Sequence, residues 1–470
     1  MDFEEIQNRI KTLIDGPVYA IPEEIMATIR KKIEKTCPTS KKIYDEMIHC
    51  IPGGLEHQLV ITDPFPLTMA RSLGSKMWDI DSNEYTDFLS GAGAVILGHN
   101  YPPLREKLTQ VMADLDTAVY YPTEWELKAI KLIKEYVPSI ELFKFFQSGT
   151  EADMAAIRLA RVYTKKKKLI KIGGAYHGWS DQLTYDMHVP FSGDMESHGI
   201  PTSCFKETIA VPPNDLDALE ATFKQFEKTK GIAAIILEPL GPESGNIPVA
   251  PDYNKTVQEF CEKYDSLMIF DEVVTGFRMD LGGAQKYFNV KPDLTAFGKL
   301  LTHGHPSCGG LGGRADIMEL TASTVEPGKE KIMATGTLLG NPLTAAACYW
   351  TLTFLKAHNV IEKASKMGDL LTAKLNALFD QHGFPFFAYN FKSVVQFKIY
   401  AEINMDIRIP GNIEKAMHRN ACVNRIATAL LAENLISKRG ASAFTTFAHT
   451  AEDIDTFIAA LDRVLTLIPH

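Results

Sequence analysis

Residues 268–299 read MIFDEVVTGFRMDLGGAQKYFNVKPDLTAFGK, and this stretch decides the fold that we expect. The run 267–270 is continuously apolar, which is typical of a strand buried on both faces of a sheet, and Asp271 follows it. The run 294–297 is a second strand of this kind, and Lys299 follows it after one glycine. Ligands bind at the carboxyl ends of the strands in open α/β sheets. The sequence therefore predicts that Asp271 and Lys299 belong to one site.

A carboxylate and a primary amine in one buried site suit the chemistry of pyridoxal 5'-phosphate. Burial favours the neutral amine of Lys299, which can attack the cofactor's aldehyde and form a Schiff base. Asp271 would hold a proton on the pyridine nitrogen, so that the ring can accept electrons. For these two residues alone, a buried salt bridge is the alternative interpretation.

Composition and charge exclude several classes of protein. The chain has 470 residues, 45% of them hydrophobic, and a net charge of -9, which argues against a nucleic-acid or anionic-membrane partner. Its seven cysteines form no CxxC pair, so neither a zinc site nor a disulfide framework is indicated. The first five residues, MDFEE, are acidic, and no apolar run approaches the roughly 18 residues of a membrane span. We expect a cytoplasmic protein.

The order of apolar and amphipathic segments predicts an α/β fold in three parts. Residues 1–75 form a helical and then extended segment, and residues 76–335 alternate short apolar strands with amphipathic helices, as in a mostly parallel sheet. Residues 336–470 mix helices and short strands, as in a small α+β domain. Within this last part we expect helices near 341–356, 360–381, 415–434 and 451–467, and strands near 394–399 and 443–447.

Ser148, Gly149 and Thr150 lie between a predicted strand, 142–146, and a helix. The helix is predicted because apolar residues recur from 152 to 163 with the spacing of one helical face. Free amides at a helix N-terminus can bind a phosphate, and glycine permits close approach. An ordinary helix cap, which serine and threonine also favour, is the alternative.

Three further features surround this region. Tyr176 lies in the segment GGAYHG, where glycines on both sides would let its ring lie flat on a bound ring, although a core aromatic residue is the alternative. Glu238 directly follows the apolar strand 232–237, and residues 180–207 form an irregular segment of the kind that often closes over a site. The two histidines of HGHP at 303–306 lack a third ligand at a useful spacing, so we expect no metal site.

From about residue 52 to about residue 465 the chain resembles the class III aminotransferases, which depend on pyridoxal phosphate and have fold type I. Within that class it is similar to the glutamate-1-semialdehyde aminomutase subgroup and to transaminases of β-amino acids and D-phenylglycine. The matching segments are SGTEA at 148–152, RLAR at 158–161, YHG at 176–178, EP at 238–239, DEVVTGFR at 271–278, GGAQ at 282–285, PDLTAFGK at 292–299 and GTLLGNPL at 336–343.

The resemblance implies a large domain with a seven-stranded type of sheet, a small domain built from the C-terminal and N-terminal segments, and a homodimer. It implies that Lys299 carries the cofactor and moves the proton, and that Asp271 binds the pyridine nitrogen. The other cofactor-binding residues that it implies are Ser148, Gly149, Thr150, Tyr176, His177, Glu238, Val273 and, from the partner subunit, Thr337.

The departures from the family pattern concern the substrate. After the PGG turn, where relatives carry arginine or serine, this chain has LEHQ, which includes His57 and Gln58. Ala441 stands where the aminomutases have a glutamate, and Arg439 is our candidate for binding a substrate carboxylate through two hydrogen bonds. With Glu238, these residues form the predicted substrate site.

We therefore expect a homodimeric aminotransferase that passes an amino group from an amino acid to a keto acid or aldehyde in two half-reactions. The amino acid can be of the β, ω or D type. The first alternative is an aminomutase, which moves the amino group within one substrate, and the second is a racemase. A protein that binds the cofactor without catalysis is disfavoured, because binding alone requires neither Lys299 nor Asp271.

Overall fold

The computed structural model describes residues 1–57, 59–229, 231–323 and 328–469. The chain forms two compact units. The first, which we call the terminal unit, comprises Met1–Tyr101, Glu362–Met405 and Pro410–His470, and the second, which we call the sheet unit, comprises Pro102–Ile361 and Asp406–Ile409. The predicted domain boundaries near residues 75 and 335 stay predictions.

Within the described ranges, the sheet unit contains one seven-stranded sheet in the order β4-β10-β9-β8-β7-β5-β6. Six of these strands run parallel, and β10 pairs antiparallel with β4 and with β9. The prediction of a mostly parallel sheet is therefore confirmed. The strands are β4 (Leu142–Phe146), β5 (Lys168–Ile172), β6 (Thr208–Val211), β7 (Ile232–Leu237), β8 (Leu267–Glu272), β9 (Leu294–Phe297) and β10 (Gly309–Gly313).

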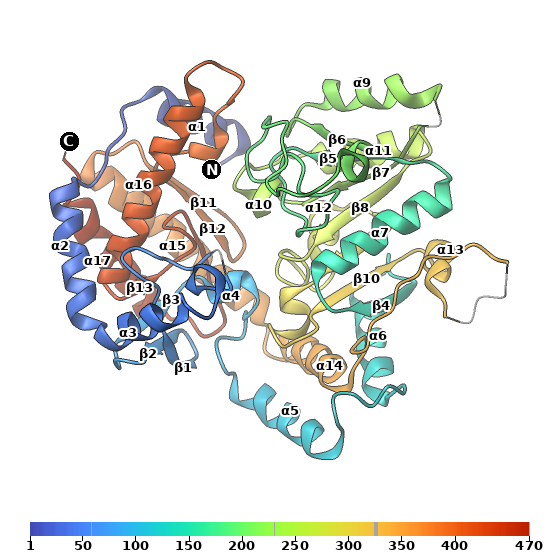
Figure 1. Ribbon diagram of the computed structural model, residues 1–470, viewed down its shortest axis with the longest axis horizontal. Coiled ribbons are helices and arrows are strands. Elements are labelled where there is room, and N and C mark those ends of the chain that lie inside the picture. The colour runs from blue at the N-terminus through green and yellow to red at the C-terminus, as the bar shows by residue number, and fades with distance from the viewer. Residues whose placement is uncertain (58, 230, 324–327, 470) are drawn as a thin grey trace. The chain divides into compact units, whose positions relative to one another are not determined.

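Helices cover both faces of this sheet, which explains why its central strands are apolar throughout (Figure 1). Along β8, Leu267 and Ile269 pack with the alanine-rich side of α7 (Gly149–Thr164). Met268 and Phe270 point to the other face, where they pack with α9 (Leu216–Glu227) and α11 (Tyr253–Lys263). This alternation continues to the end of the strand, so Asp271 lies on the α7 face.

The remaining helices of the sheet unit frame the sheet and its loops. They are α5 (Pro102–Asp114), α6 (Glu124–Tyr136), α8 (Thr202–Phe205), α10 (Pro242–Gly245), α12 (Gly283–Phe288), α13 (Ala315–Met318) and α14 (Pro342–Ala357), with the 3-10 turns η2 (Lys299–Thr302) and η3 (Glu319–Thr321). Among the described residues, no helix is long and apolar enough to cross a membrane.

The terminal unit is an α+β structure assembled from both ends of the chain, as predicted. It contains the sheets β1-β2-β3-β13 and β11-β12-β14 and an apolar core shared by its N-terminal and C-terminal helices. Its helices are α1 (Phe3–Asp15), α2 (Glu23–Thr36), α3 (Pro38–Met47), α4 (Ser90–Gly93), α15 (Val360–His382), α16 (Asn412–Ala432) and α17 (Ala451–Leu465), with the 3-10 turns η1 (Pro52–Gly54) and η4 (Glu402–Asn404). Its strands are β1 (Met69–Leu73), β2 (Lys76–Asp79), β3 (Glu84–Asp87), β11 (Phe387–Phe391), β12 (Val394–Lys398), β13 (Leu435–Ile436) and β14 (Ser442–Phe444).

Sequence analysis did not predict β10, whose sequence is GGLGG. Glycine is rare in strands because it has no side chain to pack. Here close contacts require it: a Cβ atom on Gly309 would lie 2.3 Å from the carbonyl oxygen of Ser148, and one on Gly310 would lie 2.3 Å from the ring of Phe143. Glycine therefore allows β10 to approach the loop that precedes α7.

We expect Gly309→Ala to lower the melting temperature, because the added methyl group must displace the backbone at Ser148. The expected loss is about 1–3 kcal/mol of unfolding free energy. Gly336→Ala is the control, since a Cβ atom there would meet its nearest neighbour at 3.4 Å. Equal melting temperatures for the two variants, measured by calorimetry, would contradict this account.

Candidate functional site

Parallel pairing brings three ionisable residues to the carboxyl edge of the sheet. In the ladder, Leu237 of β7 pairs with Phe270 of β8, and Asp271 pairs with Ala296 of β9. Glu238 directly follows β7, and Lys299 follows β9 after Gly298. The predicted grouping of Asp271 with Lys299 thus follows from the register of three neighbouring strands.

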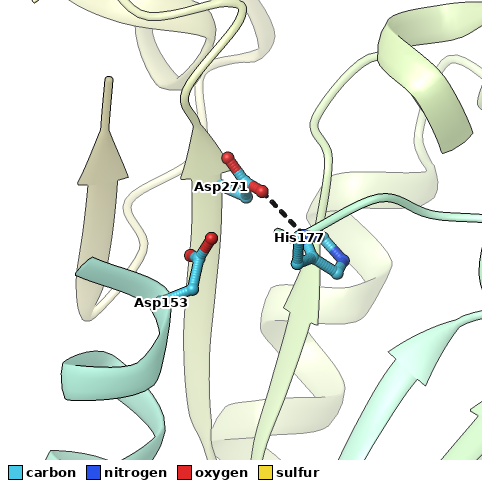
Figure 2. Close-up of side chains that lie close together, drawn as sticks. All are labelled: Asp153, His177 and Asp271. Atoms are coloured by element: carbon cyan, nitrogen blue, oxygen red, sulfur yellow. Dashed lines mark hydrogen bonds and ion pairs between the residues drawn. The ribbon is translucent and has the colours of Figure 1, made fainter. Parts of the chain in front are cut away.

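Asp271 is buried, with 6% of its surface exposed, and two donors bind its carboxylate. The backbone N–H of Val273 donates to Oδ1 at 2.9 Å. The Nδ1 atom of His177 lies 2.7 Å from Oδ2 (Figure 2). Because hydrogen bonds to a carboxylate favour its charged form, Asp271 is suited to bind a protonated ring nitrogen.

The side chain of Val273 lies between two glycines on different loops. A Cβ atom on Gly149 would lie 2.5 Å from Val273, and one on Gly298 would lie 2.8 Å from it. These contacts bring together the start of α7, the loop after β8 and the segment that carries Lys299. Gly178 likewise packs so tightly against Thr150 that a Cβ atom there would lie 2.0 Å from the threonine hydroxyl.

The N-terminus of α7 combines both interpretations of the Ser148 segment. Ser148 caps the helix, because its hydroxyl accepts a hydrogen bond of 3.3 Å from the backbone N–H of Glu151. The amides of Gly149 and Thr150 belong to the first turn, where backbone N–H groups have no acceptor within the helix. These two amides and the positive end of the helix dipole are suited to bind a phosphate.

Glu238 organises the neighbouring loops. Its carboxylate accepts hydrogen bonds from the backbone N–H groups of Tyr176 (3.0 Å), Glu243 (2.7 Å) and Ser244, and from the Ser244 hydroxyl at 3.0 Å. Burial raises the pKa of Glu238, and the four donors favour its charged form. It therefore fixes the position of Tyr176, and its predicted contacts with cofactor and substrate stay predictions.

Tyr176, the predicted stacking residue, is 40% exposed. Its ring stacks on that of His188 with centroids 5.3 Å apart. His188 belongs to the irregular segment 180–207, and its ring nitrogens lie 2.7 Å from a carboxylate oxygen of Glu196 and 3.2 Å from one of Glu243. The segment predicted to close over a site is therefore anchored beside the tyrosine.

The other predicted residues belong to other segments of the chain. Thr337 is exposed in the coil that precedes α14 of the sheet unit. His57 and Arg439 are exposed residues of the terminal unit, and Arg439 has a left-handed backbone conformation (φ 52°). Gln58 lies outside the described residues. Their roles in binding stay predictions.

Lys171 is a fully buried lysine in β5 that was not predicted to be part of the site. Its ammonium group donates to the backbone carbonyls of Ala175 (3.1 Å), Leu183 (3.0 Å), Tyr185 (2.7 Å) and Asp186 (3.4 Å). Burial lowers the pKa of Lys171 to about 8. The signal in the sequence was Lys171 itself, the one charged residue within the otherwise apolar run 169–172 of β5. Lys171 holds the loop that carries Tyr176 and His177.

We expect Lys171→Met to destabilise the protein by about 2–4 kcal/mol, because it leaves buried carbonyl groups without a donor. The loop between β5 and the irregular segment should then become susceptible to proteolysis, which limited digestion followed by mass spectrometry can map. Lys255→Met, on the exposed side of α11, is the matched control. Unfolding free energies that agree between the two variants would show that Lys171 does not hold this loop.

The chain is similar in sequence to one known family of enzymes. A sequence model described as aminotransferase class-III matches residues 60–385, which is more than half of the chain. The chain belongs to the class III aminotransferases. It is therefore an enzyme of a family that depends on pyridoxal phosphate, and the predictions of family and cofactor are confirmed.

Relatives of this class III chain have two kinds of activity in their names. Glutamate-1-semialdehyde 2,1-aminomutase 2 of Geobacillus kaustophilus (strain HTA426) is 36% identical over 434 residues, which cover 90% of this chain and 97% of that protein. The structure of an omega-transaminase from Sphaerobacter thermophilus matches with a TM-score of 0.83 and 26% identity, covering 92% and 99% of the two chains. A β-phenylalanine aminotransferase from Variovorax paradoxus matches with a TM-score of 0.82 and 26% identity, covering 95% and 99%.

Proposed function

We propose that pyridoxal phosphate binds at the carboxyl edge of the sheet, between Lys299 and Asp271. The pairing of β7, β8 and β9 that groups these residues carries the proposal. The surrounding residues fit the cofactor: the amides of Gly149 and Thr150 suit its phosphate, and the Asp271 carboxylate suits its ring nitrogen. Tyr176 and Val273 would flank the ring, and His177 would orient Asp271.

When bound, pyridoxal phosphate supplies an electron sink for the negative charge that develops at the amino-bearing carbon of the substrate. Lys299 would hold the cofactor covalently. Once an incoming amine has released it, its Nζ would take a proton from that carbon and pass it to the former aldehyde carbon of the cofactor. Its place directly after a buried strand restricts where Nζ can reach. Asp271 would keep its negative charge beside the ring nitrogen throughout.

We propose that the reaction is a transamination in two half-reactions, with an amino acid as the donor and a keto acid or aldehyde as the acceptor. The transaminase structures with TM-scores of 0.83 and 0.82 support this proposal. The names of relatives such as the Geobacillus protein support the alternative, a shift of the amino group within one amino-aldehyde, about equally well.

We further propose that Arg439 binds a substrate carboxylate, with His57 and Gln58 as further substrate residues. The enzyme would be a cytoplasmic homodimer in which Thr337 of the partner subunit contacts the cofactor phosphate. The exposure of Thr337, and of Tyr120 (76%) and Tyr121 (78%) in the same unit, supports a partner on the sheet unit.

We expect Lys299→Ala to abolish turnover, with kcat lowered about a thousandfold or more, because it removes both the covalent attachment and the base. Borohydride treatment of wild-type enzyme should fix the cofactor on the peptide that contains Lys299, and mass spectrometry can locate it. Lys291→Ala, an exposed lysine of the same unit, is the control. Wild-type turnover in the folded Lys299→Ala variant would refute the mechanism.

A screen of single half-reactions separates the two activities. Cofactor-loaded enzyme is mixed with α-, β-, ω- and D-amino compounds one at a time, and the absorbance of the cofactor and the released carbonyl product are followed. Conversion by one class of donor identifies a transaminase and its donor. If no donor reacts, but the aminated enzyme isomerises glutamate-1-semialdehyde without a second substrate, the enzyme is an aminomutase and the proposed transamination is wrong.

A further inference from the structure

Asp153 is a buried acidic residue to which no hydrogen-bond donor is directed among the described residues. It lies in the second turn of α7, four residues after Gly149, and only 1% of its surface is exposed. Neither of its carboxyl oxygens receives a hydrogen bond from a donor in the described part of the chain. A buried polar group in this state is expensive, so its position requires an explanation.

The side chain of Asp153 lies beside Asp271, which occupies the same face of the sheet. One oxygen of each aspartate and one ring nitrogen of His177 all lie within 4.8 Å of one another. Figure 2 shows Asp153 on the helix and Asp271 on the strand, with His177 bonded to Asp271 on the far side. Asp153 therefore approaches the carboxylate that we assign to the ring nitrogen.

Two buried carboxylates at this distance do not both ionise, since each charge disfavours the other. Asp271 has two donors, Val273 and His177, which stabilise its charge, whereas Asp153 has none in the described structure. The proton of the pair therefore belongs on Asp153. Burial raises the pKa of Asp153 well above its usual value, and the charges of Asp271 and Glu238 raise it further, while Lys299 lowers it.

We propose that Asp153 is neutral and directs its proton to the Asp271 carboxylate, forming an acid–carboxylate pair that holds Asp271 charged and in place for the cofactor. The inference rests on the proposed function of Asp271. Asp153 is a positioning residue, since it acts through Asp271 rather than on the ring. A third donor to Asp271 would fix the orientation of that carboxylate toward the ring nitrogen.

The protonation of Asp153 is tested on the apoprotein, without any cofactor. An unfolded aspartate ionises above a pH of about 4. Because the folded protein keeps this proton to a higher pH, Asp153 contributes a loss of stability as the pH rises, and Asp153→Asn lacks that contribution. We expect the melting temperature of Asp153→Asn to exceed that of the wild type by a few degrees at pH 8, with a difference that shrinks toward pH 5.

Asp114→Asn, an exposed aspartate of α5, should show no such trend with pH. A pH-independent difference for Asp153→Asn, or a variant less stable than the wild type at pH 8, would overturn the proposal, because Asp153 would then be ionised. A stoichiometric divalent ion in the wild-type apoprotein that is absent from Asp153→Asn would overturn it as well.

The positioning role is tested by cofactor binding to the apoprotein, titrated by absorbance. Asp153→Asn keeps a donor that can reach Asp271, so its Kd for pyridoxal phosphate should stay within about twofold of the wild type. Asp153→Leu has a similar volume and no donor, and we expect its Kd to rise about tenfold, as for one lost hydrogen bond to a charged group. Equal binding by all three would overturn the positioning role.

These outcomes separate the inference from the proposed function. If the wild type fails to bind pyridoxal phosphate through Lys299, the proposed function fails, whatever the stability of the variants. If the wild type binds it and the variants show neither the pH trend nor the difference in Kd, the inference alone fails.

Discussion

The candidate site depends on the hydrogen bonds that hold the buried carboxylate of Asp271. A carboxylate buried at the end of β8 is stable only if donors replace the water that it has lost. Val273 supplies one from the residues directly after the strand, and His177 supplies the other from the loop after β5. The second bond links two segments that are about a hundred residues apart in the sequence. The position of the β5 loop is therefore coupled to the carboxylate that we propose for the cofactor's ring nitrogen.

Close packing at glycines holds the same loops together from another side. Gly149 and Gly298 both contact Val273 where any side chain would clash, and Gly309 contacts the backbone of Ser148 in the same way. Glycine costs conformational entropy on folding. The gain is that the start of α7, the loop after β8 and the Lys299 segment converge within the width of one side chain. Adjacent segments are therefore placed so that they could contact the phosphate, the ring and the aldehyde of one flat cofactor.

The sequence predicted those strands that can be recognised from the hydrophobicity of their own residues. The strands β7 and β9 were predicted with the bounds that they have, because a short apolar run identifies a strand that is buried on both faces. The strand β10 was missed, since its glycines reflect contacts with Ser148 and Phe143.

The site shows the same division between local and distant causes. Asp271 and Lys299 were predicted because each follows an apolar run, and the sheet places the ends of these runs at one edge. Lys171 and Asp153 were missed because the reasons for their burial lie in distant loops and strands. Asp153 is next to the apolar face of α7 in the helical pattern, and an acid in that place was a usable signal.

The buried carboxylates of the sheet unit differ in the number of hydrogen-bond donors that are directed to them. Glu272 follows Asp271 and is directed to the opposite face, where the backbone N–H groups of Ala284 (2.6 Å) and Gln285 (3.1 Å), with two side-chain donors, bind it. Burial raises the pKa of Glu238, Glu272 and Asp153 alike. Glu238 and Glu272 each have four hydrogen bonds to offset that cost, and both serve to connect loops. Asp153 has no donor among the described residues, so a proton shared with Asp271 is the means that we propose for keeping it buried.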